Sequence, residues 1–233
     1  LPVTDVSLSG IETAGEGEGV CVGAPLSGVD VRISPLSSEG LADGELTDRP
    51  DVRGEVCVHA AHVKDRYDVL WALERTTSRN AGWHRTGDVG HLDAQGRLWI
   101  EGRLQHVITT ASGAVTPVGI EQRVERIDGV SAAAVVGVGP AGAQVVVAVV
   151  VAAGRRPGRS GRRLRPGGRG ARLRLAGADL ADAVRAGAGA DIAAVLLARE
   201  LPVDVRHQSK VDRSEVARRA GRLLAGARPD RRP

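Results

Sequence analysis

Hydrophobic and polar residues alternate along the first hundred residues with the two-residue period of β-strands. Three valine-rich segments that end at turn residues predict strands at 20–23, 29–33 and 54–59. Residues 83–101 predict a β-hairpin whose turn lies at 93–96. A helix-like pattern occupies residues 61–80. We therefore expect the first part of the chain, residues 1–101, to consist mostly of β-structure.

The pattern changes after Gly102 and Arg103, where helical periods and apolar runs alternate. Helices are predicted at 120–127, 180–186 and 215–225. Apolar runs of strand length lie at 132–138 and 145–152, whereas the apolar run at 194–201 fits a strand or a helix. The fold class expected for the whole chain is α+β, with a second, α+β domain at residues 102–233.

The positive net charge comes from one segment. Residues 154–175 contain nine arginines and no acidic residue, and the rest of the chain holds 23 basic against 28 acidic residues. Such a run can contact nucleic acid through phosphates, but it has no aromatic residue on which a base could stack. We interpret it as a solvated, disordered Arg/Gly-rich insertion in the second domain, and we do not expect nucleic acid as a partner.

The sequence lacks the features of membrane-spanning and secreted proteins. No apolar run of 18 residues is present, so no membrane span is expected. No signal peptide is visible at the start of the chain, which favours a cytoplasmic protein. Cys21 and Cys57 lie in valine-flanked strand segments and are expected to be buried free thiols. The chain begins at Leu1 without methionine, which suggests that it is truncated.

Two motif matches have simpler explanations. Residues 137–142 fit the pattern G-x-G-x-x-G, but a valine-rich strand follows them where a dinucleotide site needs a helix. We therefore expect a hairpin turn there. His59 and His62 lie three residues apart without the carboxylates or cysteines that would complete a metal site, so no metal site is predicted.

Three residues could carry chemistry: Asp88, Arg103 and Lys210. Asp88 follows Thr86 and Gly87 and could accept hydrogen bonds from both hydroxyls of a ribose, or belong to an ordinary turn. Arg103 could hold a ribose or phosphate, or pair with a nearby acid. Lys210 is one of only two lysines among 32 basic residues. Its compact ammonium could stabilise charge on a transferring phosphate, or it could be an exposed loop residue.

The order and spacing of several motifs resemble the C-terminal half of the adenylate-forming acyl ligases, which include acyl-CoA synthetases and peptide-synthetase adenylation domains. The similar segments are 83–98, 101–103, 117–121 and 209–210, and their order and spacing fit the family along roughly residues 1–225. The resemblance implies a β-rich remnant of the large domain's barrel subdomain, followed by a small α+β lid domain. The lid would rotate between two half-reactions.

The resemblance also implies roles for the candidate residues. Asp88 would bind the ribose hydroxyls of ATP, and Arg103 would contact the nucleotide at the hinge. Lys210 would act catalytically, reaching the α-phosphate and the acyl carboxylate during adenylation. The substrate would be a small-molecule carboxylic acid, and Mg²⁺ would accompany ATP rather than bind a ligand set of this chain.

Departures from the family pattern point to one branch. The usual acidic hinge residue after Gly-Arg is replaced by residues 104–106, and residues 202–210 depart from the common lysine motif. This variant is similar to the branch of long-chain olefin biosynthesis, whose members close β-hydroxy acids to β-lactones without CoA. Other enzymes of a hydrocarbon pathway would then be partners. The family's phosphate loop is absent, so we expect little or no catalysis from this chain alone.

Two alternatives stay open. The chain could derive from an ordinary fatty-acyl-CoA or aryl-CoA ligase, which product analysis with and without CoA would distinguish. It could also be a non-catalytic, Arg-rich binding module. Salt-dependent polynucleotide binding that disappears on deletion of residues 154–175 would favour that second alternative.

Overall fold

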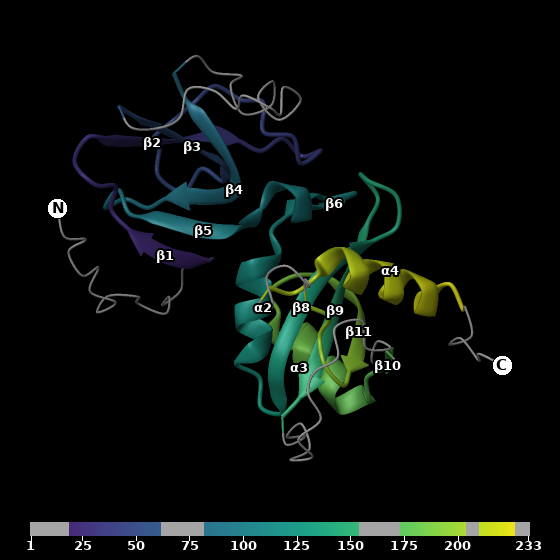
Figure 1. The fold of residues 1–233 in the computed structure, drawn as a ribbon. Helices are drawn as coiled ribbons and strands as arrows, with labels where there is room; N and C mark the ends of the chain where they lie inside the picture. The colour runs from purple at the N-terminus through teal and green to yellow at the C-terminus, as the bar shows by residue number, and fades with distance from the viewer. Residues whose placement is uncertain (1–18, 62–81, 154–172, 204–209, 227–233) are drawn as a thin grey trace. The chain divides into compact units, whose positions relative to one another are not determined.

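The computed structural model describes residues 19–61, 82–153, 173–203 and 210–226. The chain divides into two compact units, Leu1–Gln105 and His106–Pro233, and each is described by itself (Figure 1). Gly102 and Arg103 end the last strand of the first unit, so the division falls slightly later than the expected boundary. The helix expected at 61–80 lies almost entirely outside the described residues.

The first unit is a five-stranded antiparallel sheet with the order β1-β5-β4-β3-β2. Its strands are β1 (Val20–Gly23), β2 (Val29–Pro35), β3 (Gly54–Ala60), β4 (His84–Leu92) and β5 (Leu98–Arg103). All of the strands predicted from the alternating pattern are confirmed. Ile33, Val56 and Leu92 form a buried apolar cluster on this sheet, and Cys21 and Trp99 form a second one.

Asp93 makes the turn between β4 and β5. Its Oδ1 accepts the backbone N–H groups of Gln95 and Arg97 at 2.9 and 2.8 Å. Its Oδ2 accepts Arg97 Nε at 2.7 Å and Trp99 Nε1 at 2.9 Å. Burial alone would raise the pKa of the Asp93 carboxyl group, but these hydrogen bonds outweigh it and hold that pKa well below its usual range.

Asp93→Asn should therefore destabilise the protein in a pH-dependent way. A single amide oxygen cannot replace two carboxylate oxygens, and we expect a loss of about 2 kcal/mol in unfolding free energy at pH 7. A lowered folded pKa contributes stability above the unfolded pKa of about 4, which is lost as the pH falls toward the folded pKa. In urea unfolding, the difference in unfolding free energy between wild type and Asp93→Asn should be about 1 kcal/mol smaller at pH 3 than at pH 7. Equal differences at both pH values would contradict this account.

The second unit begins with a small hairpin and continues as a helix-covered sheet. The hairpin strands are β6 (Ile108–Thr110) and β7 (Gly113–Val115), preceded by the 3₁₀ turn η1 (Leu104–His106). The sheet has the order β10-β11-β9-β8, from β8 (Val130–Val138), β9 (Val145–Ala152), β10 (Arg174–Leu175) and β11 (Ile192–Ala198). Its helices are α2 (Pro117–Glu125), α3 (Ala178–Gly187) and α4 (Arg213–Leu224).

Helices cover both faces of this sheet, which explains the nearly continuous valine runs of β8 and β9. On one face, Val135, Ala148 and Val150 pack with residues of α2 and α3. On the other face, Val136 and Val149 pack with residues of α4 (Figure 1). Strands β9 and β11 are parallel, whereas β8 and β9 are antiparallel. The α+β fold class is confirmed.

Some expected boundaries were wrong. Helix α2 begins at Pro117 rather than at residue 120, because Thr116 is extended and proline suits the first helical turn. The ambiguous run at 194–201 is strand β11, which ends at Ala198. The segment interpreted as a disordered insertion, 154–175, extends too far: Arg174 and Leu175 form β10 and pair with β11. Residues 154–172 of that segment lie outside the described residues.

Candidate functional site

A bulge interrupts β4 where it pairs with β3. Between the pairs Cys57–Arg85 and Glu55–Val89, the three residues 86–88 lie opposite a single residue of β3. A bulge of this kind bends a strand and redirects its side chains. Asp88 is the last residue of the bulge, so the bulge decides where its carboxylate points.

Thr86 and Gly87 give the bulge its shape. The Thr86 hydroxyl donates to Val56 O at 3.0 Å and accepts the Asp88 N–H at 3.0 Å. Gly87 has a φ of +74°, a conformation that glycine adopts without strain. The Thr-Gly-Asp sequence therefore forms a hydrogen-bonded bulge within β4.

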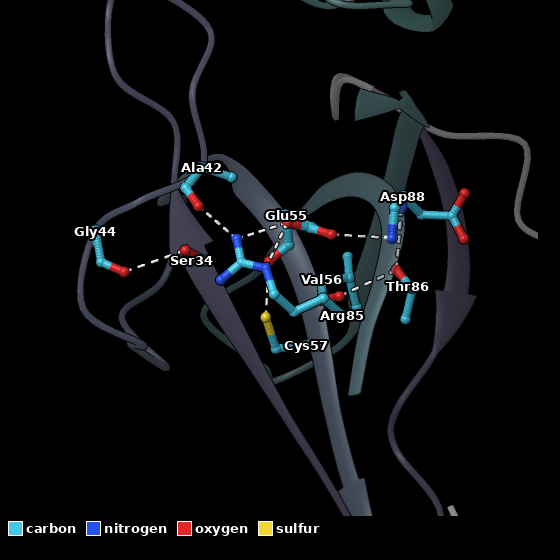
Figure 2. Close-up of polar contacts among 10 residues, drawn as sticks. Ser34, Ala42, Gly44, Glu55, Val56, Cys57, Arg85, Thr86 and Asp88 are labelled. Carbon is cyan, nitrogen blue, oxygen red and sulfur yellow. Dashed lines mark hydrogen bonds and ion pairs between the residues drawn. The ribbon is translucent and has the colours of Figure 1, made fainter. Parts of the chain in front are cut away.

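A buried ion pair lies behind the bulge (Figure 2). Glu55 Oε2 accepts Arg85 Nε at 2.8 Å, and both residues are only 3% exposed. The same guanidinium also donates to the Ala42 carbonyl. Glu55 Oε1 accepts the N–H of Gly87 at 3.1 Å. Strand β3 thus holds the bulge of β4 through one carboxylate.

Asp88 and Arg103 are brought together at the end of β5. They are cross-strand partners, and Arg103 Nε lies 3.0 Å from Asp88 Oδ1. Arg103 Nη1 also donates to Thr86 O at 3.3 Å. The side chains of Asp88 and Arg103 are 35% and 50% exposed, and ion pairs so exposed contribute little to stability. The carboxylate can therefore exchange this contact for hydrogen bonds accepted from bound hydroxyls, and the guanidinium can exchange it for hydrogen bonds donated to a hydroxyl or phosphate.

Lys210 lies in the second unit and is exposed. Val211, which follows it, forms a β-bridge with Val203, and the Asp212 N–H donates to Pro202 O at 2.8 Å. These contacts join the two described ends of the segment that contains Lys210. The Asp212 carboxylate then caps α4 by accepting the Glu215 N–H at 3.0 Å.

Glu121 of α2 fixes the start of α4. Its Oε2 accepts Arg213 Nη2 at 2.6 Å, and its Oε1 accepts Arg213 Nε at 3.2 Å. Oε1 also accepts the backbone N–H of Val135 in β8 at 2.8 Å. One nearly buried carboxylate therefore links α2, β8 and the helix that begins three residues after Lys210.

The structure explains one of the two motif matches. Residues 139 and 142 are positive-φ glycines of the turn between β8 and β9, so the G-x-G-x-x-G match is a hairpin turn. His59 lies 5.5 Å from the Trp83 ring, and His62 is outside the described residues. The described residues include no cluster of metal-binding side chains and no helix suited to span a membrane.

Both cysteines are buried and free, as expected. Burial raises the pKa of the Cys57 thiol to about 11, and the nearby Arg85 guanidinium offsets only part of that increase. A thiol with such a pKa is protonated at neutral pH and is a poor nucleophile. Cys57 is therefore part of the core.

The sequence alone did not reveal the residues that hold the candidate site residues in place. Glu55 and Arg85 were not singled out, although a glutamate inside the apolar strand Gly54–Ala60 was a visible signal. Buried charges need partners, so such a residue predicts a buried cation nearby. The pairing of Glu121 with Arg213 had no comparable signal, because 92 residues separate them along the chain.

The sequence of the chain is similar to those of several enzymes of known activity. No family model matches the chain. The olefin β-lactone synthetase of Stenotrophomonas maltophilia is 33% identical over 86% of this chain, which covers 36% of that protein. The indoleacetate–CoA ligase of Aromatoleum aromaticum is 34% identical over 44% of this chain and 20% of its own length.

A solved structure supports the fold. The ATP-bound MatB of Rhodopseudomonas palustris superimposes with a TM-score of 0.65 at 22% identity, over 87% of this chain and 36% of that protein. At this identity the likeness concerns the fold alone. The chain thus spans little more than a third of the β-lactone synthetase and of MatB.

Proposed function

Because the chain belongs to the adenylate-forming acyl ligase superfamily and matches the C-terminal part of its members, we propose that it is part of an enzyme that activates carboxylic acids. A carboxylate oxygen of the substrate attacks the α-phosphorus of ATP, and pyrophosphate leaves. The product is an acyl-adenylate. The first unit contributes a nucleotide-binding bulge, and the second unit, His106–Pro233, forms the lid domain.

The pairing of Asp88 with Arg103 carries this proposal. The carboxylate can accept hydrogen bonds from the two ribose hydroxyls of ATP, while the guanidinium contacts the ribose or a phosphate. Because both side chains are partly exposed, ATP can replace their contact with each other by contacts to the nucleotide. Lys210 supplies a mobile positive charge to the α-phosphate and the substrate carboxylate. Mg²⁺ would arrive with ATP, as the family resemblance implies.

We further propose that the acid is a long-chain β-hydroxy acid and that the product is a β-lactone. The β-hydroxyl oxygen attacks the acyl carbon, AMP leaves, and the hydroxyl proton is released. The alignment with olefin β-lactone synthetase spans 86% of the chain, which supports this branch. The alignment with indoleacetate–CoA ligase favours the alternative that CoA is the second nucleophile.

The test uses the native protein purified from its source cell. It should release pyrophosphate only when ATP and a carboxylic acid are both present. A β-lactone formed without CoA would support the lactone branch, whereas acyl-CoA formed only with CoA would support the alternative. Absence of acid-dependent AMP formation across β-hydroxy, fatty and aryl acids would exclude carboxylate activation.

Asp88→Asn should weaken the use of ATP without weakening the use of the acid. The amide has one acceptor oxygen in place of two, so we expect the KM for ATP to rise about tenfold. The KM for the carboxylic acid should stay unchanged, as measured by acid-dependent pyrophosphate exchange. Asp30→Asn is the matched control, because Asp30 is an exposed acid on β2 of the same sheet. A rise in both KM values would contradict a specific ribose contact.

A further inference from the structure

The bulge that presents Asp88 is held by a carboxylate that the proposed reaction does not use. Glu55 lies in the core of the first sheet and is only 3% exposed. A buried carboxylate is costly unless it is paired and hydrogen-bonded, and both of its oxygens are occupied here. An apolar residue would fill the same place in β3 at lower electrostatic cost. The presence of Glu55 therefore requires an explanation other than packing.

The two oxygens of Glu55 have different partners. Oε2 is bound by the Arg85 guanidinium, which is itself tied to the Ala42 carbonyl. Oε1 accepts the N–H of Gly87, the residue directly before Asp88. Arg85 thus orients the carboxylate, and the carboxylate orients the peptide that leads into Asp88.

We propose that Glu55 is a positioning residue for nucleotide binding, which holds the 86–88 bulge so that the Asp88 carboxylate meets the ribose hydroxyls. This inference rests on the proposed function. Thr86 alone does not replace Glu55, because its hydroxyl fixes the N–H of Asp88 and leaves that of Gly87 without an acceptor. Glu55 acts on the ligand only through Asp88.

Glu55→Gln is the informative variant. It keeps the length and shape of the side chain but offers one acceptor oxygen to two donors, Arg85 and Gly87. The charged guanidinium is the stronger donor, so the Gly87 N–H should lose its partner. Ile33→Ala is the control for a general loss of stability, because Ile33 is fully buried in the same sheet and belongs to its apolar cluster.

The first measurement is discrimination between ATP and 2′,3′-dideoxy-ATP in the native protein, from the ratio of the two kcat/KM values. Wild type should favour ATP, and Glu55→Gln should reduce the ratio about tenfold. Ile33→Ala should leave the ratio unchanged even where it lowers thermal stability. In the Asp88→Asn background, Glu55→Gln should reduce the ratio little further, because both changes act on one contact. An unchanged ratio in Glu55→Gln would overturn the inference.

The second measurement does not depend on activity. Amide hydrogen exchange of this chain should show Gly87 protected in wild type and in Ile33→Ala, but exposed to exchange in Glu55→Gln. Equal protection in Glu55→Gln and wild type would overturn the positioning role even if the enzyme activates no acid. Loss of protection together with inactive wild-type protein would support the local role of Glu55 and count against the proposed function instead.

Discussion

Lys210→Ala should lower the rate of acyl-adenylate formation by about 10²–10³-fold in the native protein. The ammonium group is expected to stabilise negative charge as the α-phosphate is attacked, and alanine leaves that charge without a partner. Lys210→Arg should not restore the rate, because a planar guanidinium does not replace a compact ammonium at a reacting phosphate. Acid-dependent pyrophosphate exchange measures this step directly.

The effect should be confined to the first half-reaction. Given a synthetic acyl-adenylate, the Lys210→Ala protein should form its final product at the wild-type rate. Arg218→Ala is a suitable control, because Arg218 is a half-exposed basic residue of α4 that pairs with Glu215 of the same helix. Equal losses in both half-reactions would assign Lys210 to the general stability of the lid.

Local patterns predicted most of the secondary structure because the strands and helices obey simple periods. The hairpin from Trp83 to Glu101 followed from alternation and from the turn chemistry of Asp93, and the structure confirms both. The strand at Ile192–Ala198 stayed ambiguous because it is buried on both faces, and a continuous apolar run carries no period. Its parallel pairing with β9 is a long-range contact.

The candidate residues could be named from the sequence, but their supports could not. Asp88 and Arg103 belong to recognisable motifs, but a register shift between β4 and β5 is needed to pair them, since the hairpin alone would place Asp88 opposite Gly102. The bulge at 86–88 is held by Glu55, which lies more than thirty residues earlier in the chain. The alternation of hydrophobic and polar residues does not reveal where a strand contains extra residues opposite its partner. Sequence motifs thus identified the residues that we propose to bind the nucleotide, Asp88 and Arg103. The structure adds the residue that positions Asp88, which is Glu55.

Glu121→Leu should lower the unfolding free energy by about 3 kcal/mol, the largest stability effect expected in the second unit. Leucine is similar in size, so the packing of α2 is largely kept. The change leaves the Arg213 guanidinium, whose side chain is 21% exposed, without its carboxylate. It also removes the acceptor of the buried Val135 N–H. Urea unfolding of this chain, followed by a probe in the second unit, measures the loss.

Asp182→Leu is the matched control, because Asp182 pairs with Arg185 on the exposed side of α3. Exposed pairs of this kind contribute about 0.5 kcal/mol. The double variant Glu121→Leu, Arg213→Leu should recover part of the loss, since it removes the unpaired charge but leaves the Val135 N–H without an acceptor. A double variant as unstable as the sum of its single variants would contradict the ion pair as the cause. The link between α2 and α4 would then depend on packing alone.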